Sequence, residues 1–158
     1  RDAGVAVGAH PGFPDLAGFG RRNMTIPAPE LEDLVLYQIA AVAGVAASEG
    51  VALHHVKAHG ALYNMAVHDR ATADAIARAA RAFSPSLRMC APPGSVMERA
   101  ALDAGLRVAR EGFADRAYQP DGSLVPRHVP GAMIVGVEAV VTRAIGMATE
   151  RRVVCIDG

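Results

Sequence analysis

Short apolar segments alternate with amphipathic segments along most of this chain, and this alternation limits the possible folds more than any other feature. Apolar residues at spacings of three and four mark the amphipathic segments as helices with one buried face. Apolar segments that alternate with such helices form parallel sheets covered by helices, so the sequence predicts an α/β fold. The expected strands span residues 4–10, 53–59, 87–91, 106–110, 132–135 and 153–158.

The expected helices have marked ends. Gly50 is a plausible end for the first helix, which begins near residue 30. Asp69 and Ser95 are expected N-caps of the next two helices, because their side chains accept hydrogen bonds from free backbone N–H groups. A last helix is expected over residues 138–149.

Polar residues gather directly after the expected strands, over residues 10–23, 57–64 and 111–127. Parallel barrels form their active sites from the loops that follow the carboxyl ends of the strands. Open, doubly wound parallel sheets instead form their active site at a single crevice. The spread of polar clusters over several loops therefore favours a (β/α) barrel, or part of one.

Composition narrows the class of protein. The 16 basic and 16 acidic residues give a net charge of zero, so the sequence has no electrostatic footprint for nucleic acid and no basic membrane anchor. The longest apolar stretch, residues 34–47, is expected to be too short to span a bilayer. Cys90 and Cys155 lie in apolar segments and are expected to be free thiols in a reducing cytoplasm.

Residues 1–158 are expected to form one domain, because a chain of this length with 51% hydrophobic residues can bury a single core. The sequence lacks an initiator methionine and closes on an expected strand. We therefore expect it to be the interior portion of a longer domain.

Lys57 and His59 are the first candidates for chemistry. Side chains alternate along a strand, so these two side chains are expected to point to the same side. His10 ends the first expected strand, on the same face as Ala6 and Gly8. If the strands are neighbours, the two histidines approach each other at one rim.

A divalent metal is one use for such histidines. His10, His59 and His55 are candidate ligands, although no tight metal-binding spacing occurs. The alternative is neutral histidines that are hydrogen-bonded to substrate or to loop backbone.

Two further clusters are candidates for binding. Arg21 and Arg22 follow a glycine-rich loop and are suited to a carboxylate or phosphate, or they are solvated surface residues. Asp115, Arg116 and Tyr118 lie at a strand exit and either serve a site or form a salt bridge within the loop. The sequence contains no phosphate-binding loop, no complete dinucleotide fingerprint and no serine-hydrolase elbow.

Three segments together resemble the LamB/YcsF family of lactam-utilisation proteins. They are Gly8-Ala9-His10-Pro11-Gly12-Phe13-Pro14-Asp15 with residues 18–24, then Val56-Lys57-Ala58-His59-Gly60-Ala61-Leu62-Tyr63-Asn64, and then Phe113-Ala114-Asp115-Arg116-Ala117-Tyr118 with residues 122–132. Ala58 stands where the family normally has proline. Further family segments would lie outside residues 1–158.

This resemblance implies a seven-stranded (β/α) barrel of the glycoside hydrolase/deacetylase type, incomplete at both ends. It also implies ATP-coupled opening of the lactam of 5-oxoproline to glutamate in the cytoplasm, together with 5-oxoprolinase subunits B and C. The resemblance leaves open whether ATP binds to this chain or to a partner subunit. It also leaves open whether the protein forms a homo-oligomer.

The resemblance also implies roles for individual residues. Lys57 would stabilise the lactam oxygen, and His59 would act as general acid or base. His10 and Asp15 would orient water, substrate or a metal. The expected substrate-binding residues are Arg21, Arg22, Tyr63, Asn64, Asp115, Arg116 and Tyr118.

Two other functions fit the same residues. One is a metal-dependent deacetylase or amidohydrolase on the same barrel, which would need bound metal and no ATP. The other is a non-catalytic subunit that binds a lactam.

Overall fold

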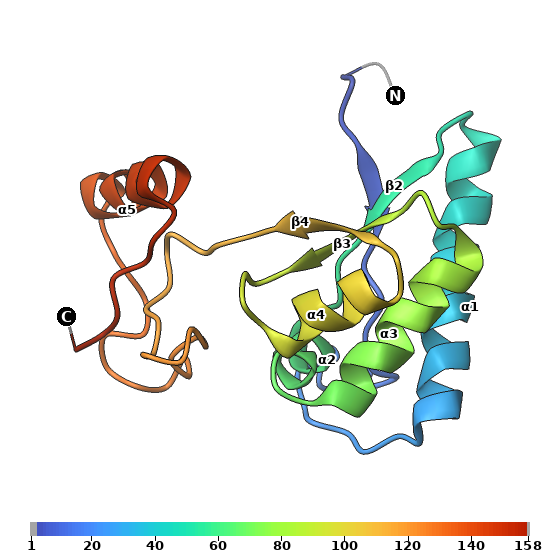
Figure 1. The fold of residues 1–158 in the computed structure, drawn as a ribbon, viewed down its shortest axis with the longest axis horizontal. Helices are drawn as coiled ribbons and strands as arrows, with labels where there is room; N and C mark the ends of the chain where they lie inside the picture. Colours follow the sequence, from blue (N-terminus) through green and yellow to red (C-terminus); the bar gives the residue numbers. More distant parts are fainter. Residues whose placement is uncertain (1–2, 158) are drawn as a thin grey trace. The chain divides into compact units, whose positions relative to one another are not determined.

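Four parallel strands form one sheet in the order β1-β2-β3-β4 in this computed structural model, which describes residues 3–157 (Figure 1). The strands are β1 (Val7–Ala9), β2 (Leu53–Val56), β3 (Arg88–Ala91) and β4 (Arg107–Arg110). The helices are α1 (Ala28–Ser48), α2 (Gly60–Ala66), α3 (Arg70–Phe83), α4 (Val96–Asp103) and α5 (Val137–Glu150).

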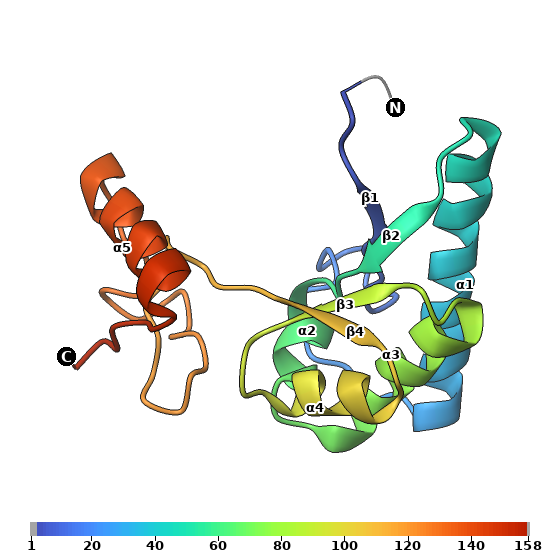
Figure 2. The ribbon, with the colours of Figure 1, turned by 45° about the horizontal axis from the view of Figure 1, so that its top comes forward.

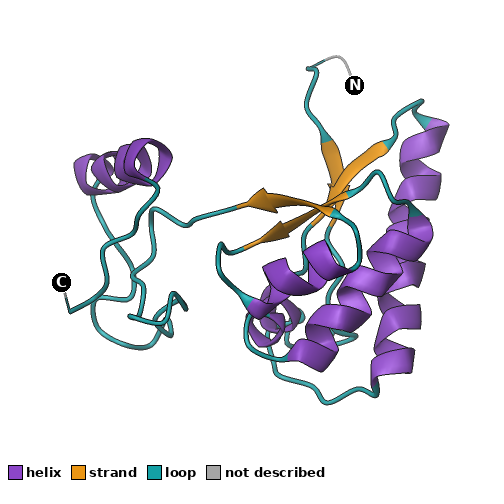
Figure 3. Cartoon of the chain, in the orientation of Figure 1, coloured by secondary structure: helices purple, strands orange, loops and turns teal. Residues whose placement is uncertain are grey.

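The sequential strand order determines where the helices lie. Crossovers between parallel strands are right-handed, so strands added always on the same side place their helices on one face of the sheet. Figure 3 shows α1, α3 and α4 together on one face, and the turned view in Figure 2 agrees. A doubly wound sheet reverses its strand order. The observed order is that of a barrel-like arc, which confirms the parallel α/β prediction.

The chain divides into two compact units, Arg1–Arg110 and Glu111–Gly158. The first unit contains the whole sheet and α1 to α4, and the second contains α5. The single domain that the sequence suggests stays a prediction.

Helix α1 packs on α3, and its buried residues are Leu31, Val35 and Ile39. Its 21 residues have a mean hydropathy of 1.4 in their most apolar window and are long enough, by length and composition, to cross a membrane. The expectation that this stretch is too short is therefore wrong on length, because the helix extends beyond residues 34–47 at both ends. Its buried stripe nevertheless belongs to the core of the first unit.

The two expected N-caps are confirmed. The Asp69 carboxylate accepts a hydrogen bond of 2.9 Å from the Thr72 N–H, at the start of α3. Ser95 Oγ accepts one of 3.0 Å from the Glu98 N–H, at the start of α4. Both caps satisfy N–H groups that have no partner within the helix.

Glu98 joins the loop after β3 to the end of β4. Its carboxylate accepts hydrogen bonds of 2.6 Å from the Gly94 N–H and from Arg110 Nε. Burial alone would raise the pKa of Glu98, but these hydrogen bonds hold it below its usual value.

The expected strands at 132–135 and 153–158 are wrong for the described residues. Met133 makes one isolated bridge with Arg116, and Cys155 makes one with Tyr118. Gly131 and Gly136 have φ of 82° and 97°, so they bend the chain on both sides of 132–135. The second unit instead has a small core of Ala117, Val125 and Ala132.

Candidate functional site

The imidazoles of His10 and His59 lie against each other at the carboxyl ends of β1 and β2. Nε2 of His10 is 3.1 Å from Nδ1 of His59, and the ring planes meet at 79°. His10 directly follows β1, and His59 follows β2 after two residues. The predicted approach of these two histidines is thereby confirmed, while their catalytic roles stay predictions.

The backbone after β2 brings the two rings together. The regular strand ends at Val56, three residues earlier than expected, because helix α2 begins at Gly60. The chain stays paired up to that point, since the Lys57 N–H donates to Ala9 O and the His59 N–H donates to Pro11 O. Lys57 and His59 are two residues apart, and both donate their N–H groups to the segment of β1 and the residues that follow it. In an extended chain, residues two apart have their side chains on the same face, as the sequence predicts.

The outer nitrogens of the histidine pair meet backbone carbonyls. Nδ1 of His10 is 2.5 Å from the Lys57 carbonyl oxygen, and Nε2 of His59 is 2.7 Å from that of Phe19. The pair therefore connects the end of β1, the end of β2 and the loop after β1.

Asp15 organises the loop after β1. Its buried carboxylate accepts hydrogen bonds from the Gly18 N–H at 2.9 Å, from the Arg22 N–H at 3.3 Å and from the Arg22 guanidinium. The Arg22 side chain is the main reason that the pKa of Asp15 falls to about 2. Asp15 and Arg22 thus bind each other, and the geometry favours a structural role in the loop for both.

The absence of a side chain at Gly20 leaves room for the His59 ring. A Cβ on Gly20 would come within 3.0 Å of His59 Cδ2, and its φ of 67° is one that side chains rarely adopt. The centre of the Phe19 aromatic ring lies 5.2 Å from the centre of the His59 ring, edge to face. This packing holds the imidazole between the loop and the end of β2.

Gln38 of α1 is a positioning residue that the sequence analysis missed. Its Oε1 accepts a hydrogen bond of 2.9 Å from the Gly12 N–H, and its Nε2 donates one of 2.9 Å to the Gly12 carbonyl. Gly12 lies beside the His59 ring, since a Cβ there would be 3.3 Å from Cδ2. The sequence signal that could have found it is the single polar side chain, Gln38, within the apolar stretch of residues 34–47, because a buried amide needs a hydrogen-bonding partner.

The other predicted residues of the first unit have different surroundings. The guanidinium carbon of Arg21 lies 5.6 Å from the centre of the Phe19 ring, and the residue is exposed. Lys57 is half-buried, Tyr63 is buried in α2 and Asn64 is exposed. Their roles in substrate binding and catalysis stay predictions.

A metal bound by these histidines stays a prediction. His55 lies against Gly8 of β1, and its Nδ1 is 3.3 Å from Nδ1 of His54. Across residues 3–157, no three or more His, Cys, Asp or Glu side chains are grouped so that they could hold a metal ion. All four ring nitrogens of His10 and His59 also have hydrogen-bonding neighbours. The contacts to the Lys57 and Phe19 carbonyls are backbone hydrogen bonds of the kind that the alternative interpretation expects.

The residues predicted from the third segment lie in the second unit. Arg116 is buried and donates a hydrogen bond of 2.7 Å to the Val125 carbonyl, and burial lowers its pKa. The buried Tyr118 hydroxyl accepts a hydrogen bond of 2.7 Å from the Phe113 N–H, and burial raises its pKa.

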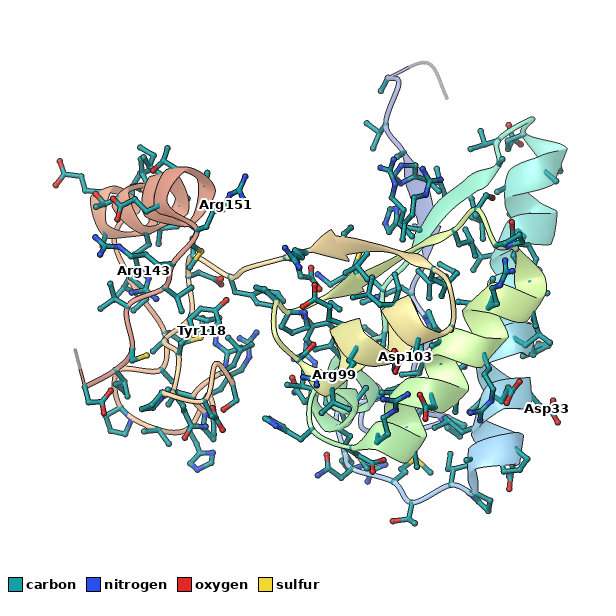
Figure 4. All side chains as sticks on the ribbon, viewed as in Figure 1. Asp33, Arg99, Asp103, Tyr118, Arg143 and Arg151 are labelled. Atoms are coloured by element: carbon teal, nitrogen blue, oxygen red, sulfur yellow. The ribbon has the colours of Figure 1, made fainter. Side chains whose placement is uncertain are left out.

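Arg143 of α5 braces this segment. It donates to the Arg116 carbonyl at 2.9 Å, and Figure 4 shows it beside the segment that carries Tyr118. Asp115 is exposed. Binding roles for Asp115, Arg116 and Tyr118 stay predictions.

A parallel sheet in sequential order, with paired histidines at the carboxyl ends of adjacent strands, defines a barrel-like α/β protein with a candidate site at its rim. The chain belongs to the LamB/YcsF family, whose family model matches residues 1–158.

The chain is similar to curated proteins that are named as the A subunit of 5-oxoprolinase. It is 56% identical over 155 residues to the one from Tolumonas auensis and 54% identical to the one from Bordetella pertussis, covering 98% of this chain and 62% of each relative. It is also similar to the crystal structure of a lactam utilization protein from Thermus thermophilus, with 52% identity and a TM-score of 0.93, over 99% of this chain and 64% of that one. The chain thus spans about three fifths of the length of these relatives.

Proposed function

We propose that this chain is part of the A subunit of an ATP-dependent 5-oxoprolinase, which opens the lactam of 5-oxo-L-proline to L-glutamate together with subunits B and C. The observation that carries the proposal is the paired His10 and His59 in a chain whose relatives are named for that component of 5-oxoprolinase. We also propose that the complete domain is a seven-stranded (β/α) barrel and that it works in the cytoplasm.

The chemistry of the reaction fits the residues at this rim. A lactam is an unactivated amide, so its oxygen needs positive charge nearby, or phosphorylation, before water can attack. Lys57 is the proposed cation for that oxygen. His59, which is hydrogen-bonded to His10, is the proposed general acid or base.

Binding of the substrate carboxylate is assigned to Arg21. Its neighbour Arg22 is committed to Asp15, whereas the exposed Arg21 lies over the ring of Phe19, which also touches His59. A planar guanidinium suits a carboxylate because it donates two parallel hydrogen bonds.

We assign the binding site for ATP to the assembled complex of subunits. The sequence has no phosphate-binding loop, so we propose that a partner subunit supplies the principal contacts to ATP. ATP supplies the driving force for opening a stable amide, and the residues of this chain hold and orient the lactam.

The test is glutamate release from 5-oxoproline by the complex of all three subunits, with and without ATP. Lys57→Met and His59→Ala are each expected to lower turnover by about 10²–10⁴-fold, the usual contribution of such groups. His68→Gln, an exposed histidine in the turn after α2, is the matched control and is expected to keep full turnover.

Three results would contradict the proposal. Unchanged turnover in both Lys57→Met and His59→Ala would remove its central residues. Activity that needs no ATP and is lost on chelation would indicate a metal-dependent amidohydrolase. Binding of 5-oxoproline without turnover in the complete complex would indicate a non-catalytic subunit.

A further inference from the structure

We propose that Phe19 is a specificity-determining residue of the rim site, where its ring forms an apolar wall against which the carbon atoms of a small lactam pack. Phe19 lies in the loop after β1, between Gly18 and Gly20. Its part in recognising the lactam rests on the proposed function, and it identifies which portion of the substrate this loop selects.

The backbone of Phe19 has a conformation that a bulky side chain rarely adopts. Its φ is 55°, in the left-handed region that favours glycine, and among residues 3–157 the only other non-glycine residue with positive φ is Arg151. A glycine at position 19 would remove this strain. The chain has glycine on both sides of that position, yet it carries phenylalanine there. We therefore expect the phenyl ring to contribute something that offsets the strain.

Burial within the chain does not offset it. Phe19 is 70% exposed, whereas Phe13 of the same loop is 6% exposed and belongs to the core. An exposed ring gains little from the hydrophobic effect, because its surface stays in contact with water. Phe19 is therefore placed for a contact outside the core of its own unit.

Hydrogen bonds on both sides of Phe19 hold the strained loop. The Arg21 N–H donates to the Gly18 carbonyl at 3.0 Å, which closes a turn around Phe19. The carbonyl of Phe19 itself lies 2.7 Å from Nε2 of His59. Strained residues persist where their surroundings determine them in this way, and they cluster at ligand sites. The ring is thus held at the rim before any ligand arrives, which reduces the entropy lost on binding.

The neighbours of the ring are two residues that we assign to the reaction. Its centre lies 5.2 Å from the centre of the His59 ring and 5.6 Å from the guanidinium carbon of Arg21. In 5-oxoproline, the carbon that bears the carboxylate is bonded to the lactam nitrogen, and two methylene groups complete the ring. A lactam that meets both His59 and Arg21 therefore has ring carbons beside Phe19, where their burial stabilises the complex.

A fixed wall at this point selects for ring size. A six-membered lactam has one more methylene group, which must either displace the phenyl ring or move the amide away from His59. A pocket of fixed shape discriminates between substrates that differ by one methylene by about 10–200-fold. The site is therefore expected to prefer the five-membered lactam.

The test compares Phe19→Gly with the parent in the complete complex of three subunits. This change removes the ring and relieves the backbone, so the variant is expected to unfold at the same denaturant concentration as the parent or a higher one. The KM for 5-oxoproline is expected to rise about tenfold or more, with a smaller change in kcat, because the lost contact is made in the bound ground state as well.

Two further variants separate the ring from the strain. Arg151→Gly is the matched control, because it relieves the same kind of backbone at the end of α5, where φ is 56°, and it is expected to leave KM unchanged. Phe19→Tyr keeps an aromatic ring on the strained backbone and is expected to keep the KM of the parent.

Ring-size preference is a readout that a merely structural role would not move. It is the ratio of kcat/KM for 5-oxoproline to kcat/KM for 6-oxopiperidine-2-carboxylate, the homologue with one more methylene group. We expect this ratio to fall about tenfold in Phe19→Gly and to stay at the parent value in Arg151→Gly. An unchanged KM in Phe19→Gly, or equal losses for both lactams, would overturn the inference. Loss of subunit association in Phe19→Gly, measured by analytical ultracentrifugation, would also overturn it, since the ring would then belong to a subunit interface.

Calorimetric binding of 5-oxoproline to the complex separates this inference from the proposed function. Weaker binding by Phe19→Gly, in a complex that never releases glutamate, would support the wall and contradict the function. Glutamate release with an unchanged KM in Phe19→Gly would do the reverse. A parent complex that neither binds nor opens 5-oxoproline would contradict both.

Discussion

The side-chain amide of Gln38 pairs with the backbone of Gly12 through two hydrogen bonds, each 2.9 Å long. These residues are 26 positions apart, and they join the middle of α1 to the loop that follows β1. Because Gly12 adjoins the His59 ring, this pair links the core helix to the candidate site.

Replacing Gln38 by leucine is expected to lower both stability and turnover. The change leaves the N–H and C=O of Gly12 without their partner, which costs about 1–3 kcal/mol in the free energy of unfolding. Denaturant unfolding measures the loss, and the His59 nitrogen signals in ¹⁵N NMR should move as the loop shifts. Tyr37→Leu, at the exposed neighbouring position, is the control and is expected to change stability by less than about 0.5 kcal/mol. Unmoved His59 signals in Gln38→Leu would show that this pair does not position the ring.

Removing the Asp15 carboxylate is expected to destabilise the protein in a pH-dependent way. The pKa of Asp15 is lowered from 3.8 to about 2 in the folded state, so its stabilising effect is full above pH 3.8 and is lost as the pH falls towards 2. Asp15→Asn should therefore unfold at lower denaturant than the parent at neutral pH, and the difference should shrink towards pH 2.

Asp33→Asn, on the exposed side of α1, is the matched control for Asp15 (Figure 4). An Asp15→Asn variant with the same unfolding curve as this control at neutral pH would contradict the structural role of the Asp15–Arg22 pair.

Adding a methyl group at Gly20 is expected to displace His59. Gly20→Ala forces a side chain into a backbone with φ of 67° and brings its Cβ to 3.0 Å from the ring. The backbone strain costs about 1–3 kcal/mol. The matched control is Gly105→Ala, where φ is 75° but no atom lies within 4 Å of the added Cβ. Both variants should lose stability, whereas only Gly20→Ala should shift the His59 nitrogen signals and lower turnover.

The N-cap of α4 is expected to contribute measurably to stability. Ser95→Ala removes the hydrogen bond from the Glu98 N–H and should lower the free energy of unfolding by about 1 kcal/mol. Ser48→Ala, at the exposed end of α1, should have a smaller effect. Equal effects would mean that the cap contributes little here.

Local patterns account for much of the fold. The Asp69 and Ser95 caps were predictable because each acts on an N–H three residues away in the chain. The meeting of His10 and His59 was predictable because neighbouring parallel strands bring their carboxyl ends to one edge. The strand expected at residues 132–135 failed because a strand needs a partner, and its apolar residues alone could not specify one.

The parallel α/β class and the pair of histidines at the rim could be predicted from the order of the amino acids, since they depend on short-range pattern and strand order, and the family was identified by the resemblance of three segments. Three relationships became visible only in the folded chain: Arg22 engages Asp15, Gln38 holds Gly12, and the two imidazoles meet backbone carbonyls on both outer sides. The physical reason is that a polar side chain satisfies its hydrogen bonds with whatever group folding brings near, and that group can lie anywhere in the sequence.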